Sequence, residues 1–514
     1  MLKINKLFIL FLVLFAVNNS TTAQKKKSKP NVLFIVVDDL KPVLGVYGNK
    51  NVKTPAMDKL AKSGIVFENA YVQQAVCAPS RISAFTGMRP DRTKVTDLHT
   101  NMRDMNPDIV TMPQFFKQHG YETTGFGKLM HGAKNNDPRS WTIPCKEDKD
   151  LTYAKGYKIP VFNQYQNPET QKLVENIDWT KMKRKEIVQF LRKNNALTST
   201  ECLDVPDNAY ADGAIAETAI NMLDKLSKNK KPFFLALGFH KPHLPFVAPK
   251  KYWDMYDREQ IPLAAFQQHA KNSPEYAYHN WGELRKYSDI PEKEDLDTAK
   301  QKELIHAYRA SVSYVDAQIG KVLDALKEKG LDKNTIVVLW GDHGWHLGDH
   351  GLWCKHTNFE QATKVPFIIS ASGYKKNKKA YTMTEMVDIF PTLAEYTGLK
   401  IPEYLEGESL IPVLKNPQTE IKDYAISQYP RGKNIMGYSI RTKQYRLTIW
   451  LKGDFKNEEL YRNPQIAAIE LYDYKNDPLE KVSLANEAQY AEIVKQLKGK
   501  LLKILVSEAD KQKK

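Results

Sequence analysis

Cysteine is scarce in this chain. The 514 residues include only Cys77, Cys145, Cys202 and Cys354, and this low count excludes a small fold held together by a disulfide framework. If Cys77 is set aside for chemistry, at most one intrachain disulfide can form, and Cys145 with Cys202 is the expected pair. The protein must therefore fold by burying a large apolar core, which its length allows.

Long apolar runs are missing as well. The run from Leu7 to Val17 follows Lys3 and Lys6 and precedes Thr21-Thr22-Ala23, and its length of about 11 residues is well below the roughly 20 that a membrane helix needs. This pattern predicts a cleaved signal peptide over residues 1–23. We expect a periplasmic or secreted protein with no membrane span.

Acidic residues are outnumbered, which leaves a formal net charge of +16. Part of the excess lies in the run from Lys25 to Lys29 and in the C-terminal lysines, and such runs are usually solvated. The rest is compatible with a polyanionic substrate or, without catalysis, with a polyanion-binding protein. No recognisable nucleic-acid-binding module is present, so nucleic acid is not expected as a partner.

Several apolar runs end in polar residues, which indicates an α/β fold. Residues 32–37 lead into Asp38, residues 233–237 lead to His240, and residues 335–340 stop at Gly341-Asp342-His343. Continuous apolar strands are buried on both faces, and residues 305–326 show the spacing of one helix face. We predict a large mixed or mostly parallel sheet sandwiched by helices, with ligands beyond the carboxyl ends of the strands.

The pattern changes near residue 420. Alternating strands are expected at residues 438–441 and 445–450, with a final helix near Ala491 to Ile504. The prediction is a catalytic α/β domain over residues 30–415 and a smaller C-terminal α+β domain over residues 420–510. Residues 145–205 and 250–300 are polar, aromatic-rich and weakly periodic, and both are expected to be insertions over the active face.

Carboxylates follow two of the predicted strands. Asp38 and Asp39 come from one strand end and Asp342 from another, the arrangement expected for a hard divalent cation with oxygen ligands. An Asp-Asp pair after a strand is also common as a cap or turn, so the metal interpretation depends on Cys77 and the Gly341–Gly344 motif. His343 would be a further ligand, although calcium prefers oxygen.

Cys77 lies at the expected start of a helix that runs through Arg81, where backbone N–H groups favour an anion. Other candidates could hold anionic oxygens or transfer protons. These are Lys128, His131, His240 and Lys355. Single lysines and histidines are more often structural, so this interpretation depends on their meeting at one edge of the sheet.

Specific segments resemble type I sulfatases of the alkaline-phosphatase superfamily, and within that family the iduronate-2-sulfatases. The segments are Val36–Leu40, Cys77–Arg81, Gly127–His131, Gly238–His243, Asp342–Trp345, Ala310–Tyr314, Phe390–Leu393, Ser427–Arg431 and Met436–Arg441. The resemblance covers nearly the whole mature chain. It implies that a formylglycine-generating maturation enzyme converts Cys77 to formylglycine (3-oxoalanine).

The family pattern also implies a role for each matching residue. One calcium ion would be held by Asp38, Asp39, the formylglycine from Cys77, Asp342 and His343. Arg81 would support the formylglycine, and Lys128 and Lys355 would bind sulfate. His240 would protonate the leaving sugar oxygen, and His131 would take the proton from the second hydroxyl as sulfate departs.

The implied function is hydrolysis of sulfate esters in a sulfated polysaccharide or its oligosaccharides. Two glycan classes fit, and an algal ulvan-type polymer is preferred to 2-sulfated uronic acid in glycosaminoglycans. A phosphoester or phosphonate hydrolase on the same fold, with an unmodified nucleophile, is the alternative. Departures from the family pattern at His346, Cys354 and the short segment 432–435 are expected to reshape the pocket that binds the sugar.

Overall fold

The computed structural model describes residues 29–132, 136–162, 164–455, 457 and 459–511. The predicted signal peptide at residues 1–23 lies outside these described residues. Within them, no helix combines the length and apolarity needed to cross a membrane.

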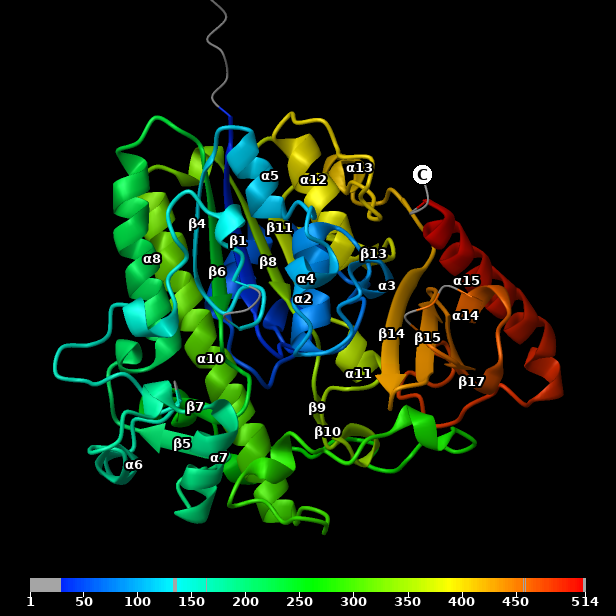
Figure 1. Ribbon diagram of the computed structural model, residues 1–514, viewed down its shortest axis with the longest axis horizontal. Helices are drawn as coiled ribbons and strands as arrows, with labels where there is room; N and C mark the ends of the chain where they lie inside the picture. Colours follow the sequence, from blue (N-terminus) through cyan, green and yellow to red (C-terminus); the bar gives the residue numbers. More distant parts are fainter. Residues whose placement is uncertain (1–28, 133–135, 163, 456, 458, 512–514) are drawn as a thin grey trace, which may run out of the picture.

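A seven-stranded mixed sheet forms the centre of the larger part of the molecule (Figure 1). Its strands are β1 (Asn31–Val37), β2 (Ile65–Phe67), β4 (Glu122–Gly127), β6 (Phe233–Phe239), β8 (Thr335–Gly341), β11 (Phe367–Ser370) and β12 (Lys378–Ala380). They lie in the order β12-β2-β11-β8-β1-β6-β4. Strand β1 is parallel to β6 and β8, whereas β11 is antiparallel to β8 and β2. The predicted α/β class is confirmed.

Helices cover both faces of this sheet. One face packs against α1 (Pro55–Lys62), α8 (Ala211–Ser227) and α10 (Thr298–Glu328), and the other against α2 (Cys77–Thr86), α5 (Met112–Gln118) and α12 (Ile389–Tyr396). In β1, Leu33 and Ile35 belong to the first core, and Val32 and Phe34 to the second. Burial on both faces explains why this strand is apolar throughout.

A four-stranded antiparallel sheet follows toward the C-terminus. It consists of β14 (Ala425–Arg431), β15 (Ile435–Arg441), β16 (Tyr445–Lys452) and β17 (Ile466–Asp473), and α15 (Ala491–Lys511) packs against it (Figure 1). The predicted strands and final helix are confirmed, and the helix is longer than expected. The domain limits at residues 415 and 420 stay predictions.

The two predicted insertions contain short elements. The first holds α6 (Pro168–Leu173), α7 (Arg184–Lys193) and β5 (Thr200–Leu203), which pairs with β7 (Phe246–Pro249). The second holds short 3-10 helices such as η9 (Leu284–Lys286). The remaining α-helices and strands have two to five residues each and are β3 (Ala70–Tyr71), α3 (Pro90–Thr93), α4 (Met102–Met105), α9 (Lys250–Trp253), β9 (His346–Leu347), β10 (Trp353–Cys354), α11 (Glu360–Thr363), β13 (Thr384–Glu385), α13 (Ile411–Lys415) and α14 (Glu459–Arg462).

The predicted disulfide between Cys145 and Cys202 is wrong. All four cysteines are free. Cys145 follows β4 and is half-buried, whereas Cys202 lies in β5 and is exposed. The spacing of cysteines in the sequence says nothing about which elements lie next to each other, so it could not identify a pair.

Candidate active site

Four strands of the central sheet end at one edge, and the residues after them carry the predicted chemistry. Asp38 and Asp39 follow β1, Lys128 follows β4, His240 follows β6 and Asp342 follows β8. These strands are parallel neighbours, so their carboxyl ends meet. The structure thus brings together residues that are far apart in the sequence.

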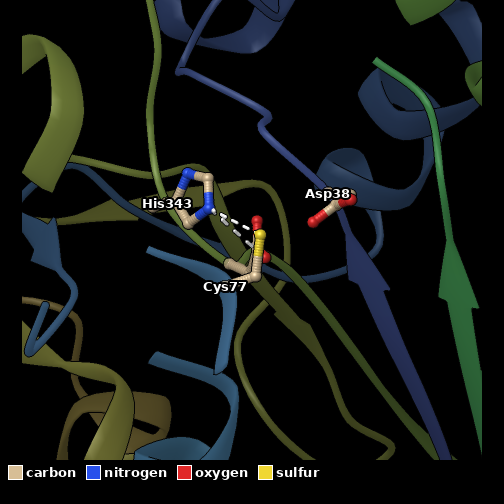
Figure 2. A group of neighbouring side chains, drawn as sticks. Asp38, Cys77 and His343 are labelled. Atoms are coloured by element: carbon tan, nitrogen blue, oxygen red, sulfur yellow. Dashed lines mark hydrogen bonds and ion pairs between the residues drawn. The ribbon is translucent and has the colours of Figure 1, made fainter. Parts of the chain in front are cut away.

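Cys77 is the first residue of α2 and faces this edge. Its Sγ lies 3.3 Å from Nε2 of His343 and 3.4 Å from Nζ of Lys128. Figure 2 shows Cys77 and His343 facing each other, with Asp38 at the end of its strand. The residue here is cysteine, so Sγ marks the position that the oxygens of a formylglycine would take. The side chain is buried within a helix start, where an anion is favoured.

Two overlapping groups of side chains could hold a metal ion. They are Asp38, Cys77, Asp342 and His343, and Asp38, Asp39, Cys77 and His243, with the ligand atoms of each group within 4.8 Å of one another. Carboxylate oxygens suit a hard cation such as calcium, and a formylglycine oxygen in place of Sγ would strengthen that preference. With an oxygen donor at residue 77 in place of sulfur, which is a soft ligand, the set would fit a hard divalent cation, and imidazole nitrogen would be its one unusual member.

Buried cations balance these carboxylates. Arg81 donates from Nη2 to Asp38 and from Nε to Asp342, both at 2.8 Å, and Nζ of Lys128 donates to Asp38 at 2.6 Å. Burial alone would raise the pKa of Asp38, but the charges of Lys128 and Arg81 outweigh it and hold that pKa well below its usual range. Arg81 thus ties α2 to the ends of β1 and β8.

Lys355 links this centre to the second insertion. Its Nζ lies 3.1 Å from both carboxylate oxygens of Asp39 and 2.9 Å from Oε2 of Glu283. Glu283 also accepts hydrogen bonds from Nε2 of His243 at 3.0 Å and from Nε2 of His356 at 3.2 Å. The sequence prediction missed Glu283, because it lies in a segment without helix or strand periodicity.

His131 and His240 have opposite surroundings. Burial, with the charge of Lys128 added, lowers the pKa of His131 to about 2, and its Nδ1 has no hydrogen-bond partner among the described residues. Burial would lower the pKa of His240 too, but Asp148 outweighs it and raises that pKa. One imidazole is therefore neutral and the other favours its cationic form, the pattern expected of a base and an acid.

A cavity of about 1070 Å³ opens beside these groups. Of the predicted site residues, it is lined by Asp38, Cys77, Lys128, His131, His240 and Lys355. The insertions add Arg184, Lys185 and Lys286, which are exposed and make no ion pair within the described part of the chain. Arg184 stacks over the ring of Phe162, with 4.6 Å between the guanidinium carbon and the ring centroid.

His346, Cys354 and residues 432–435 lie off the cavity wall, so the expectation that they reshape the pocket stays a prediction. His346 is fully buried and bonds through Nε2 to the hydroxyl of Thr357, and Cys354 is buried beneath the site. The side chains of His346 and Cys354 face the protein interior, whereas the two insertions supply many of the residues on the cavity wall.

The fold and the site together define a hydrolase. A nucleophile position at a helix start, a donor set for a hard cation and lysines around both suit the attack of an oxygen on a tetrahedral oxyanion ester.

Comparison with known proteins defines the family. The sulfatase family model matches residues 30–399, and the model for the C-terminal part of N-sulphoglucosamine sulphohydrolase matches residues 348–507. The chain belongs to the sulfatase family of alkaline-phosphatase-like hydrolases, and it is a sulfuric ester hydrolase. The predicted family is confirmed.

Individual relatives cover almost all of the chain. Human iduronate 2-sulfatase is 33% identical over 94% of this chain and 96% of its own length. An ulvan-active sulfatase of Formosa agariphila is 28% identical, with 95% and 83% covered. Among solved structures, the phosphonate monoester hydrolase of Agrobacterium radiobacter superposes with a TM-score of 0.70 at 22% identity, covering 93% of this chain and 96% of that one, which shows a shared fold.

Proposed function

We propose that this sulfatase removes sulfate from a sulfated glycan, using a formylglycine that a maturation enzyme makes from Cys77. The observation that carries the proposal is the position of Cys77, at the start of α2 and within 3.4 Å of both Lys128 and His343. A nucleophile there would meet a sulfate group held by buried positive charge.

The centre would prepare the ester for attack. A hydrated formylglycine supplies one hydroxyl that attacks sulfur and a second that releases the bound sulfate. A calcium ion would be held by Asp38, Asp39, residue 77, Asp342 and His343, where it would withdraw charge from the sulfate oxygens. Arg81 keeps the carboxylates in place through its two ion pairs.

Four side chains would bind the sulfate and move protons. Lys128 and Lys355 would hold sulfate oxygens and offset the charge that grows as the ester breaks. His240 favours its protonated form and would give a proton to the leaving oxygen. His131 is neutral and would accept the proton of the second hydroxyl as sulfate departs.

The cavity wall supports an anionic glycan as substrate. Arg184, Lys185 and Lys286 bring positive charge to the cavity that no described acidic side chain pairs with, and a carboxylate or second sulfate of the glycan would complement it. An ulvan-type algal polymer is the first candidate. The second candidate is 2-sulfated uronic acid in a glycosaminoglycan, and the sequence identity to iduronate 2-sulfatase favours it. The expected location is the periplasm or the outside of the cell.

Sulfate release from ulvan and from heparan oligosaccharides, measured by ion chromatography, tests the proposal. The enzyme is matured by a formylglycine-generating partner, residue 77 is checked by mass spectrometry, and Cys77→Ala is the control. Release from one glycan identifies the substrate class.

Loss of activity with a chelator and its return with calcium are expected. Hydrolysis of a phosphonate ester by protein with unmodified Cys77, without any sulfate release, would instead support the phosphoester alternative.

A further inference from the structure

Asp148 contacts one of the two cavity histidines from the first insertion. It begins the short 3-10 helix Asp148–Asp150 and lines the cavity. Its Oδ1 lies 3.0 Å from Nε2 of His240, and both side chains are only 14% exposed. Within the described part of the chain, the Asp148 carboxylate has no other hydrogen-bond or ion-pair partner. Among the described residues, the Asp148 carboxylate therefore interacts with His240 alone.

Asp148 contacts the ring of His240, and the other hydrogen bonds around this residue involve only the backbone. The backbone N–H groups of His240 and Lys241 donate to the two oxygens of Asp212 at 2.7 Å and 2.8 Å. The ring bonds to Asp148 through Nε2, and Nδ1 has no partner among the described residues. An imidazolium has two N–H donors, so one can serve Asp148 while the other stays available to a substrate in the cavity.

We propose that Asp148 is a positioning residue that keeps the His240 ring protonated and oriented, with one N–H on the carboxylate and the other presented to the leaving oxygen. The inference rests on the proposed function of His240. As a hydroxyl oxygen of the formylglycine at residue 77 bonds to sulfur and the S–O bond to the sugar breaks, the leaving oxygen takes the proton from the second ring nitrogen, and Asp148 stays ionised. The neutral ring then recovers a proton from water before the next turnover.

The charges around His240 agree with this role. Burial opposes protonation, Asp148 and Asp212 favour it, Lys128 opposes it, and the net result is a raised pKa. Because its pKa is raised, His240 stays protonated to a higher pH than a free imidazole does. It loses the proton only as the pH rises through the pKa of His240 in the folded protein. Burial would raise the pKa of Asp148, but the charge of His240 outweighs it and lowers that pKa.

Replacing Asp148 tests the proposal with two substrates. A sugar sulfate has a strongly basic leaving oxygen that needs a proton, whereas 4-nitrophenyl sulfate releases a weakly basic phenolate that does not. Asp148→Asn should lower kcat on the sugar sulfate by about 10- to 100-fold, near the lower end of general-acid effects, and leave 4-nitrophenyl sulfate nearly unchanged. The basic limb of the pH profile on the sugar sulfate should move to lower pH.

Matched variants separate positioning from folding. Asp148→Glu should restore part of the rate, and Asp150→Asn, an exposed residue of the same short helix, should behave as wild type. A second measurement needs no turnover: the His240 imidazole, titrated by NMR in Cys77→Ala, should have a higher pKa than in Cys77→Ala combined with Asp148→Asn.

Three outcomes would overturn the inference. Equal losses on both substrates with an unchanged pH profile would show a purely structural role. Wild-type kinetics on the sugar sulfate, or the same His240 pKa with and without Asp148, would remove the positioning role. In each of these cases sulfate release by wild type still stands, whereas failure of wild type to release sulfate from any glycan or aryl ester would overturn the proposed function itself.

Discussion

The two sides of the candidate active-site cavity are built in different ways. One side, the centre, consists of residues at the strand ends and at the start of α2. The side chains of Asp38, Arg81 and Asp342 there are at most 1% exposed. The wall includes many residues of two long insertions, and its Arg184 and Lys286 are exposed. A sheet edge between two apolar cores holds reacting groups in fixed positions, while loops can change without disturbing them. We infer that the centre sets the reaction and the wall selects the substrate.

Removing Cys77 should have the largest effect and should affect the reaction alone. Cys77→Ala leaves the wall intact but no group that can attack sulfur, so sulfate release should fall by about 10⁴-fold or more. Binding of a substrate oligosaccharide, measured by calorimetry, should persist because Lys128, Lys355 and the wall cations remain. Substantial turnover by this variant would show that the nucleophile lies elsewhere.

Replacing Arg81 should disrupt the structure of the centre. Arg81→Met leaves buried Asp342 without its guanidinium partner and leaves Asp38 with Lys128 alone, and breaking a buried pair costs about 3–5 kcal/mol in the free energy of unfolding. Denaturant unfolding with a chelator present measures the loss. Lys59→Met, which breaks an exposed pair with Asp324, should cost at most about 1 kcal/mol. Similar losses for both variants would contradict the rigid centre.

Glu283 lies where the two sides meet and should have an intermediate effect. Glu283→Gln removes the charge that Lys355, His243 and His356 share, so Lys355 is held less firmly. A hydrogen bond to a charged group contributes about 1.5–3 kcal/mol, so kcat/KM should fall by roughly ten-fold or more. Glu294→Gln, an exposed carboxylate of the same insertion, is the control. If Glu283→Gln and Glu294→Gln have equal rates, Glu283 does not couple the wall to the centre.

Neutralising the wall cations should give the smallest effect, confined to binding. Arg184→Gln combined with Lys286→Gln should raise KM for an anionic oligosaccharide by about 3- to 5-fold and weaken its salt dependence, since exposed charges contribute about 0.2–1 kcal/mol each. Turnover of 4-nitrophenyl sulfate should not change. Lys193→Gln, at the far end of α7, serves as control. A fall in kcat on the small ester would mean that these cations reach the centre.

Most of the centre could be predicted because its signals are local. Apolar runs directly followed by Asp38, His240 and Asp342 indicated buried strands, and parallel strands bring such residues to one edge. Cys77 was expected at a helix start, and α2 begins there. The wall could not be predicted in this way. Its residues lie in segments without periodicity, so the sequence indicated insertions but not which side chains they would place in the cavity.

The sequence by itself therefore determined the fold class, the family and the set of residues at the strand ends, because hydrophobic patterning and short motifs act over neighbouring positions. Only the tertiary structure decided that Asp148 would meet His240 across 92 positions and that Glu283 would reach Lys355 across 72. Such contacts depend on how an irregular insertion folds back over the sheet. That path is set by the packing of the whole chain, and no local pattern encodes it.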